Sequence, residues 1–310
     1  MAQNPVKPTA EIYVIESDEA ERMRREMNLT AVSDLLPALV PTAQRMARPQ
    51  ISRYHVGAVA LGSSGRIYLG VNVEFPGVPL HHSIHAEQFV VTNAALHGER
   101  SIQFIAVSDF PCGHCRQFLQ EIRSASQIQI QVTGQGEYRP LSYFLPNPFG
   151  PSDLLKEDVP LLLESHCNYL IEEGEKEEEI CKGLGEMEER LRAAALMAAR
   201  EAHAPYSGCP SGFALADGKG RVYAGAYMES AAYNPSLGPV QAAIVAYMVA
   251  GGSRGGGGEG GVGEGLVAAV LAEKEHAAVS QETTARVLLA AVAPKARFSV
   301  YRVRSSTSPW

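Results

Sequence analysis

The chain has 310 residues, 45% of them hydrophobic, which is enough for two globular domains of about 150 residues each. Its 27 basic and 34 acidic residues give a formal net charge of −7, so no overall positive field recruits nucleic acid. The first residues lack the apolar core of a signal peptide and no apolar run of about 18 residues exists, so we expect a soluble cytoplasmic protein that binds no membrane. Five cysteines, an odd number, indicate a reducing compartment rather than a disulfide framework.

The first part of the chain predicts two helices followed by a hairpin. A charged helix is expected over 18–27, and an amphipathic helix over 31–47, where two prolines predict a kink or a late start. Strands over 56–61 and 67–72, joined by Gly-Ser-Ser-Gly, form the predicted hairpin.

Asn72 and Glu74 stand where the chain leaves this hairpin. The two-residue alternation of a strand puts both polar side chains on one face. They are either a solvated strand end or part of a pocket for a polar substrate. The second interpretation is favoured because a metal-binding pattern begins about a dozen residues later.

That pattern has two parts, each at the start of a predicted helix. His-Ala-Glu at 85–87 opens a helix over 84–96, with Ser83 as its expected cap. After a strand over 102–107, Pro-Cys-Gly-His-Cys at 111–115 opens a helix over 113–122. Free N–H groups and the helix dipole at such positions favour a thiolate over a thiol.

His85, Cys112 and Cys115 provide the three protein ligands of a catalytic zinc, which leaves its fourth position for water. The order H-x-E…P-C-x-x-C is typical of zinc-dependent nucleobase deaminases, in which the glutamate, Glu87 here, is the general acid and base. The alternative is a reduced surface C-x-x-C beside an unrelated histidine. That alternative leaves the glutamate and the proline as coincidences.

Two more strands are expected over 128–132 and 141–145 before a proline-rich stretch at 146–153. Six glutamates at 172–179 indicate a solvated linker or helix face. We therefore predict a catalytic domain over 1–150, a linker over 151–185 and a second domain over 186–310.

This second half repeats the first. The stretch 212–229 matches 57–74 at a constant offset, because 212 − 57, 225 − 70 and 229 − 74 each give 155. That offset places Val240 at the position of His85 and Ala242 at that of Glu87, and no cysteine follows a strand expected over 266–271. We predict a catalytically silent copy with a flexible glycine-rich insertion at 251–265.

These features resemble cytidine deaminase in its two-domain form, over nearly the whole chain. The motifs that carry the resemblance are Asn-Val-Glu-Phe at 72–75, His-Ala-Glu-Gln at 85–88, Pro-Cys-Gly-His-Cys-Arg-Gln at 111–117 and Leu-Pro-Asn-Pro-Phe-Gly-Pro at 145–151. The resemblance implies an α/β fold of two α/β/α sandwich domains with mixed sheets, the second a degenerate copy of the first. It also implies one zinc ion per chain and a homodimer with shared active sites.

The activity implied by the resemblance is hydrolytic deamination of cytidine, and of 2′-deoxycytidine, to the uracil nucleoside and ammonia, in pyrimidine nucleoside salvage. Zinc-activated hydroxide would attack C4 of the pyrimidine while Glu87 carries the protons. Asn72 and Glu74 would hold the 3′-hydroxyl of the ribose.

Four further residues complete the site that the resemblance implies. The backbone at Ala86 and Phe110 would read the edge of the pyrimidine. Phe149 resembles a residue that the dimer partner inserts over the substrate. Tyr54 stands at a position where the family usually packs a phenylalanine against the pyrimidine.

Two other functions compete with this one. A deaminase that edits nucleic acid needs a basic groove with aromatic side chains beside the site, and the net charge of −7 argues against it. A catalytically dead binding or scaffold protein would fit the second half but not the complete motif of the first. Release of ammonia from cytidine, compared with single-stranded RNA, separates the three.

Overall fold

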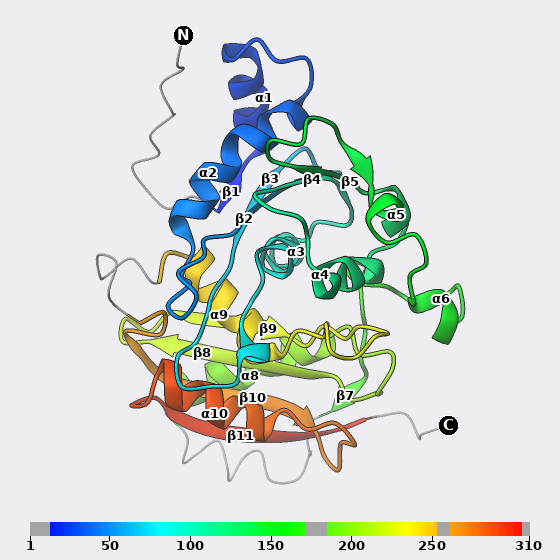
Figure 1. Cartoon of the computed structure of the whole chain (residues 1–310). Coiled ribbons are helices and arrows are strands. Elements are labelled where there is room, and N and C mark those ends of the chain that lie inside the picture. The colour runs from blue at the N-terminus through cyan, green and yellow to red at the C-terminus, as the bar shows by residue number, and fades with distance from the viewer. Residues whose placement is uncertain (1–12, 172–184, 253–260, 306–310) are drawn as a thin grey trace.

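The computed structural model describes residues 13–171, 185–252 and 261–305. The acidic stretch at 172–179 and most of the glycine-rich segment at 251–265 lie outside these residues. Within them the chain forms two sheets, one in each half, with helices packed on both (Figure 1).

The strand order is β1-β3-β2-β4-β5-β6 in the first sheet and β7-β11-β10-β8-β9 in the second. Among the described strands, β4 and β5 pair in parallel, as do β10 and β11, and the other neighbours are antiparallel, so both sheets are mixed. The strands are β1 (Val14–Ile15), β2 (Gly57–Gly62), β3 (Ile67–Val71), β4 (Ile102–Val107), β5 (Gln129–Val132), β6 (Arg139–Pro140), β7 (Leu170–Ile171), β8 (Ser211–Asp217), β9 (Val222–Ala226), β10 (Leu266–Lys274) and β11 (Arg297–Ser305).

The helices connect these strands and cover the sheets. They are α1 (Ser17–Glu26), α2 (Leu36–Met46), α3 (Ala86–Leu96), α4 (Gly113–Phe118), α5 (Leu141–Phe144), α6 (Pro151–Leu154), α8 (Glu186–Arg200), α9 (Pro239–Val249) and α10 (Glu282–Val292). Short 3-10 helices lie at Val32–Leu35, Leu80–His82, Leu119–Glu121 and Ala125–Gln127.

Two glycines of the β2–β3 hairpin show how helices cover the first sheet. A methyl group on Gly57 would lie 2.9 Å from the carbonyl oxygen of Val40 in α2, and one on Gly70 would lie 2.3 Å from that of Ala86 in α3. Gly70 pairs with Ala58, the residue after Gly57, and neighbouring strand residues point to opposite faces. Helices α2 and α3 therefore cover opposite faces, which confirms the predicted α/β/α sandwich.

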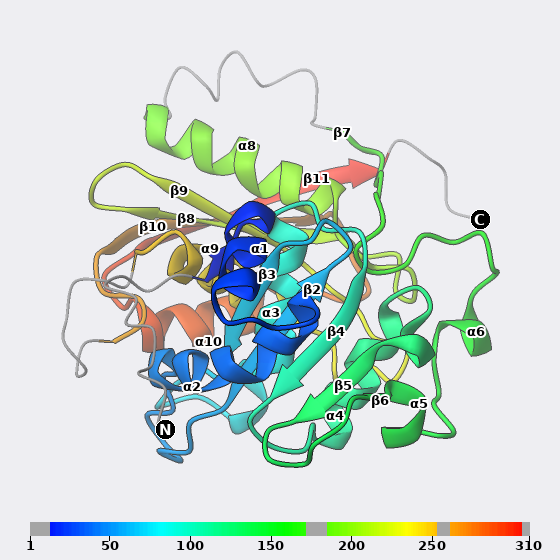
Figure 2. The same cartoon turned by 90° about the horizontal axis from the view of Figure 1, so that it is seen from above.

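The second half repeats this packing. A methyl group on Gly212 would lie 2.2 Å from the carbonyl oxygen of Ala195 in α8, and both residues follow their first-half counterparts by 155 positions, since 212 − 57 and 195 − 40 give the same value. A methyl group on Gly225 would lie 2.1 Å from the backbone nitrogen of Ala243 in α9. Figure 2 shows the resulting layers in order, α8, the second sheet and α9. The internal duplication is thus visible in the packing.

The offset of 155 does not continue into α9. In the first half Val73 and Ile84 form an isolated bridge, and the same bridge in the second half joins Met228 and Leu237. The first pair spans 84 − 73 = 11 positions and the second 237 − 228 = 9, so the second half is two residues shorter here.

This deletion corrects one sequence prediction. With the offset reduced to 153, Gly238 stands at the position of His85 and Val240 at that of Glu87. Gly238 is the N-cap of α9 and Val240 lies in its first turn, just as His85 is the N-cap of α3 and Glu87 lies in its first turn. The equivalence predicted with Val240 and Ala242 is wrong by two positions, while the loss of the ligand and of the carboxylate stands.

Most predicted elements are confirmed to within a few residues, and α2 has the late start that its prolines indicated. The strand expected over 141–145 is wrong: this segment forms α5, in which only Leu141 is buried and Pro140 is the N-cap. A short apolar run does not distinguish a strand from a helical turn. Helix α10 and strand β11 were not predicted.

The two halves share one hydrophobic core. Helix α3 packs against α9 between the two sheets, and buried side chains of both helices belong to the same cluster, among them Phe89 and Val90 of α3 and Val240 and Ile244 of α9 (Figure 1). The helix that follows His85 is therefore enclosed by both halves of the chain.

Candidate active site

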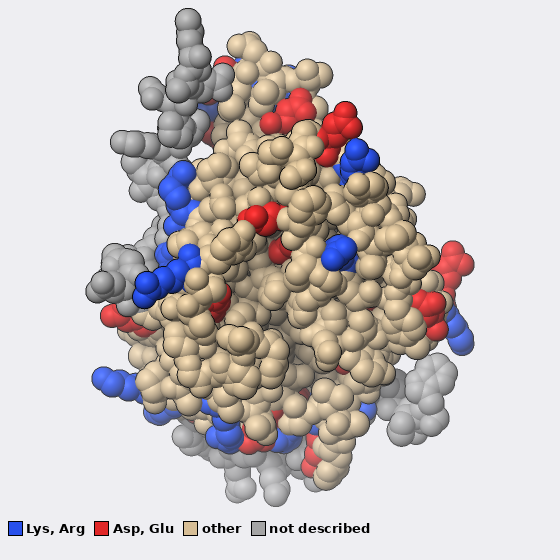
Figure 3. Space-filling view, viewed as in Figure 1, with Lys and Arg blue, Asp and Glu red and all other residues tan. Residues whose placement is uncertain are grey.

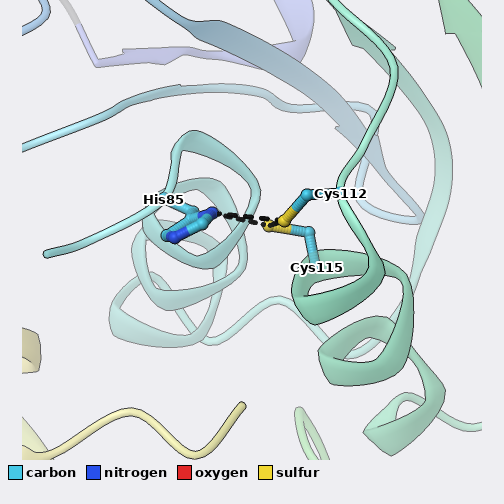
Figure 4. A group of neighbouring side chains, drawn as sticks. All are labelled: His85, Cys112 and Cys115. Carbon is cyan, nitrogen blue, oxygen red and sulfur yellow. Dashed lines mark hydrogen bonds between the residues drawn. The ribbon is translucent and has the colours of Figure 1, made fainter. Parts of the chain in front are cut away.

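Two helix starts bring together the three predicted ligands. His85 is the N-cap of α3, Cys112 is the N-cap of α4, and Cys115 lies in the first turn of α4 (Figure 4). His85 Nδ1 lies 3.5 Å from Cys112 Sγ and 3.3 Å from Cys115 Sγ, and the two sulfur atoms are 3.6 Å apart. In the described part of the chain this is the group of His, Cys, Asp and Glu side chains that could hold a metal ion.

The spacing fits zinc. Bonds of about 2.3 Å to sulfur and about 2.0 Å to nitrogen put the ligand atoms of a tetrahedral zinc roughly 3.5–3.8 Å apart. Two of the three distances, 3.5 Å and 3.6 Å, fall in that range and the third, 3.3 Å, lies just below it. The set of one imidazole and two thiols is one that zinc prefers. Three ligands leave the fourth position open, as in catalytic sites.

The charge state of the cysteines also suits a cation. The Cys115 thiol and the His85 imidazole both stabilise the Cys112 thiolate and lower its pKa to about 3. A hydrogen bond from the Cys115 thiol to Cys112 and the burial of Cys115 raise the pKa of Cys115. Because a metal binds the thiolate form, a cation held by both sulfur atoms would displace the Cys115 proton.

Glu87 lies in the first turn of α3, two residues after His85, with 4% of its surface exposed. Burial raises the pKa of its carboxyl, against the opposing effects of a backbone hydrogen bond and of the Cys115 thiol beside it. A carboxyl that is buried next to the ligand group and holds its proton more firmly than usual is suited to proton transfer.

Sequence comparison adds an independent observation. The cytidine and deoxycytidylate deaminase zinc-binding region matches residues 32–131 and again residues 141–286. Cytidine deaminase 1 of Arabidopsis thaliana is 52% identical over 301 residues, which cover 93% of this chain and 97% of that protein. The chain belongs to the cytidine and deoxycytidylate deaminase family.

A bacterial relative gives the same result: the cytidine deaminase of Serratia proteamaculans is 40% identical over 82% of this chain and 78% of its own. A crystal structure of cytidine deaminase from Mycobacterium tuberculosis is 32% identical over 38% of this chain and 96% of its own, with a TM-score of 0.35. The predicted two-domain type is confirmed, and the protein is a zinc-dependent hydrolytic deaminase. In the described residues of this deaminase, no helix has the length and apolar character needed to cross a membrane.

Asn72 and Glu74 fasten a loop in this deaminase. The amide of Asn72 donates to the carbonyl of Tyr54 at 2.9 Å and accepts from the N–H of Val56 at 2.9 Å. Glu74 accepts from the backbone N–H and the hydroxyl of Ser52, at 2.8 Å and 2.6 Å. Their predicted contact with ribose stays a prediction, and the structure adds a local role that the sequence did not reveal.

The second half repeats the glutamate contacts. Glu229, which follows Glu74 by 155 positions, accepts from the N–H of Tyr206 at 2.9 Å and from the N–H and hydroxyl of Ser207. Because the half without the ligand set keeps these bonds, they belong to the fold itself. A substrate contact by Glu74 is therefore additional to a structural one.

Three predicted contact residues are exposed aromatic side chains. Tyr54, Phe110 and Phe149 have 56%, 62% and 48% of their surface exposed. A hydrogen bond to Asp109 raises the pKa of Tyr54, so Tyr54 lies beside the segment that carries Phe110. The carbonyl of Phe149 accepts a hydrogen bond from Gln117 of α4, and Ala86 is buried at the start of α3.

Sequence reasoning missed His114, which lies inside the C-x-x-C motif. Its imidazole stacks on that of His85, with ring centroids 4.7 Å apart, and its Nε2 is buried without a hydrogen-bond partner in the described structure. The only signal in the sequence was its place between the two cysteines.

Proposed function

We propose that this deaminase hydrolyses free cytidine and 2′-deoxycytidine to the uracil nucleosides and ammonia. The observation that carries the proposal is the buried carboxyl of Glu87 beside the ligand group of His85, Cys112 and Cys115. The relatives from Arabidopsis thaliana and Serratia proteamaculans, both named cytidine deaminase, support the substrate.

Zinc bound by His85, Cys112 and Cys115 would supply a water nucleophile at neutral pH, because it lowers the pKa of bound water. Glu87 accepts a proton from the attacking water and delivers it to N3 of the pyrimidine, which makes C4 more electrophilic. It then takes the second proton of that water, from the hydroxyl now on C4, and passes it to the 4-amino group. One water enters, the C4–N bond breaks and ammonia leaves. The raised pKa of the Glu87 carboxyl suits both directions of transfer.

The surface around the site favours a small uncharged substrate. Figure 3 shows a hollow over the start of α3, surrounded mainly by residues without charge and by few lysines and arginines. A nucleic-acid strand would require a basic groove that follows its phosphates. A free nucleoside needs none.

The remaining assignments form part of the proposal. Asn72 and Glu74 bind the ribose, the backbone at Ala86 and Phe110 reads the base, and Tyr54 packs against it. Phe149, whose side chain is exposed, reaches the site of the partner in a homodimer. The enzyme works in nucleoside salvage in the cytoplasm.

The domain division is also proposed. Residues 1–150 are the catalytic domain, 151–185 a linker and 186–310 a silent copy without ligand or carboxylate. The replacement of His85 by Gly238 and of Glu87 by Val240 supports the silence of the second half.

The test compares ammonia release from cytidine, 2′-deoxycytidine, cytidine monophosphate and a cytosine-containing single-stranded RNA. We expect turnover of the two nucleosides, and none of the RNA. Turnover of the RNA with no turnover of cytidine would overturn the proposal.

A further inference from the structure

Gln88 joins the zinc-binding histidine to the second half of the chain. Its side chain is 1% exposed and makes two hydrogen bonds. Oε1 accepts from the backbone N–H of His85 at 3.3 Å, and Nε2 donates to the carbonyl of Pro235 at 2.9 Å, 147 residues away in the sequence. The same amide group therefore holds both the start of α3 and a loop of the second half.

That loop, residues 230–237, is closed by bonds of its own. The N–H of Ser230 donates to the hydroxyl of Ser236 at 2.9 Å. At the base of the loop, Met228 and Leu237, the last loop residue, exchange two backbone hydrogen bonds of 3.0 Å and 2.8 Å. Pro235 is thus presented by a short, internally bonded segment rather than by a free chain.

The loop also holds the helix that carries the cysteines. The N–H of Ala231 donates to Glu121 at 2.8 Å, and Glu121 ends the 3-10 turn that continues α4. Glu121 is fully buried and accepts two further bonds from the second half, from the hydroxyl of Tyr206 at 2.6 Å and from Nε2 of His203 at 3.3 Å. One loop of the second half is therefore bonded to both ligand-bearing elements.

We infer that the loop 230–237 is a brace that fixes α3 and α4 relative to each other and so sets the spacing of His85, Cys112 and Cys115. Gln88 and Glu121 are the positioning residues through which it acts. Neither is a ligand. The inference gives the second half a part in the metal site, although it has lost the ligand and carboxylate residues of that site.

The reason for such a brace lies in the tolerance of a metal site. Zinc ligands must stand within about 0.2 Å of their ideal distances, and loss of a partner that orients a ligand commonly costs 10–100-fold in metal affinity or activity. The two ligand groups here come from separate helices, α3 and α4, whose starts are 112 − 85 = 27 residues apart. An outside contact with both helices limits their relative movement.

The experiment measures zinc release from the folded, zinc-loaded full chain to a coloured chelator, well below the temperature of unfolding. Gln88→Met keeps the volume and removes both bonds. Gln88→Glu keeps the acceptor for His85 N–H and removes the donor to Pro235. Thr92→Val is the matched control, because Thr92 is also a buried α3 residue facing the second half, with its hydroxyl 3.7 Å from Met228 Sδ. The hydroxyl also donates to the backbone carbonyl of Gln88 at 2.8 Å, so this variant removes a bond at the same helical turn but leaves both side-chain bonds of Gln88 in place.

We expect Gln88→Met and Gln88→Glu each to release zinc about 10–100-fold faster than the unmodified protein. We expect the zinc-release rate of Thr92→Val to stay within about twofold of the unmodified rate, whatever the variant does to the unfolding temperature. It loosens the interface between the two halves without touching a ligand. Both Gln88 variants should lower kcat more than they raise KM.

A Gln88→Glu protein that releases zinc at the unmodified rate overturns the brace, even if Gln88→Met releases zinc faster. That result would show that only the bond between Gln88 and the N–H of His85 affects zinc release, and that the bond to Pro235 does not. The brace is also overturned if Thr92→Val accelerates zinc release as much as the Gln88 variants do. The faster release would then follow from a general loosening of the contact between the two halves. If Gln88→Met does not fold, the near-isosteric Gln88→Glu decides. Zinc release needs no substrate, so a failure of the proposed cytidine turnover leaves this test intact.

Discussion

The imidazoles of His85 and His114 stack with ring centroids 4.7 Å apart and planes inclined by 20°. His85 belongs to the group that could hold a metal ion, and His114 stands between the two cysteines of that group. The stack limits rotation of the His85 ring about its side-chain bonds. It therefore keeps Nδ1 directed at the sulfur atoms, 3.5 Å and 3.3 Å away.

A first prediction concerns this stack. His114→Ala should lower zinc affinity about tenfold, the low end of the cost of losing a group that orients a ligand. His114→Phe, which keeps a flat ring, should have a zinc affinity close to that of the unmodified protein. Competition with a chelator of known affinity measures both. Equal losses in the two variants would show that the nitrogens of His114 matter rather than the stacking.

A second prediction concerns zinc content. The unmodified protein should bind one zinc per chain, and Cys112→Ser should bind almost none, because a serine hydroxyl is a poor replacement for a thiolate. Cys167, which is exposed and outside the ligand group, provides the control. Cys167→Ser should keep the full zinc content by elemental analysis. Two zinc ions per chain would contradict the account of the second half.

A third prediction concerns pH. A hydrogen bond from Arg123 lowers the pKa of Glu164 below its usual 4.5, against the opposing effect of burial. Because the folded-state pKa is depressed, the pair stabilises the fold above about pH 4.5 and loses this contribution as pH falls through the lower value.

Arg123→Met should thus lower the free energy of unfolding by about 1 kcal/mol at pH 7, the upper range for a partly exposed pair, and by much less near pH 3. Urea unfolding at the two pH values measures the difference. A deficit that is the same at both values would assign it to the carbonyl contacts of Arg123 with Glu157 and Val159 instead of the ion pair.

A fourth prediction concerns the second half. A protein cut after residue 185 would lose the partners of Gln88 and Thr92 and uncover the apolar face of α3 that packs on α9. It should be poorly soluble and lose most activity although it keeps His85, Glu87 and both cysteines. Size-exclusion chromatography and cytidine turnover test this. A soluble fragment with full turnover would show that the second half is dispensable.

The sequence predicted the ligand group because its signal is local. Two short motifs, each at a helix start, contain His85, Glu87, Cys112 and Cys115. The fold brings the histidine and the two cysteines together, as the motifs predict. The expected cap at Ser83 was wrong, since His85 itself caps α3. His85 is both the predicted ligand and the N-cap residue, and the general preference for serine at N-caps does not reveal this.

Other features were beyond the sequence because they depend on distant contacts. The bond from Gln88 to Pro235 joins residues 147 positions apart, and no local sequence pattern at either residue predicts it. The two-residue deletion before α9 became visible only through the bridge of Met228 with Leu237, since the loop residues themselves have no clear counterparts. The hydrogen bonds of Glu74 with Ser52 likewise depend on how the loop folds back.

The central claim is that the buried carboxyl of Glu87 carries the protons of cytidine hydrolysis beside a zinc held by His85, Cys112 and Cys115. The most direct measurement is the cytidine turnover of Glu87→Gln at full zinc content. Glu99→Gln is its control, because Glu99 is equally buried but binds the hydroxyls of Ser63 and Ser64 away from the ligands.

We expect Glu87→Gln to keep one zinc per chain and to lose at least 10²–10⁴-fold in kcat, the usual worth of a general acid and base. Glu99→Gln should keep its turnover per folded molecule. A zinc-loaded Glu87→Gln protein with turnover within about tenfold of the unmodified enzyme would contradict the account.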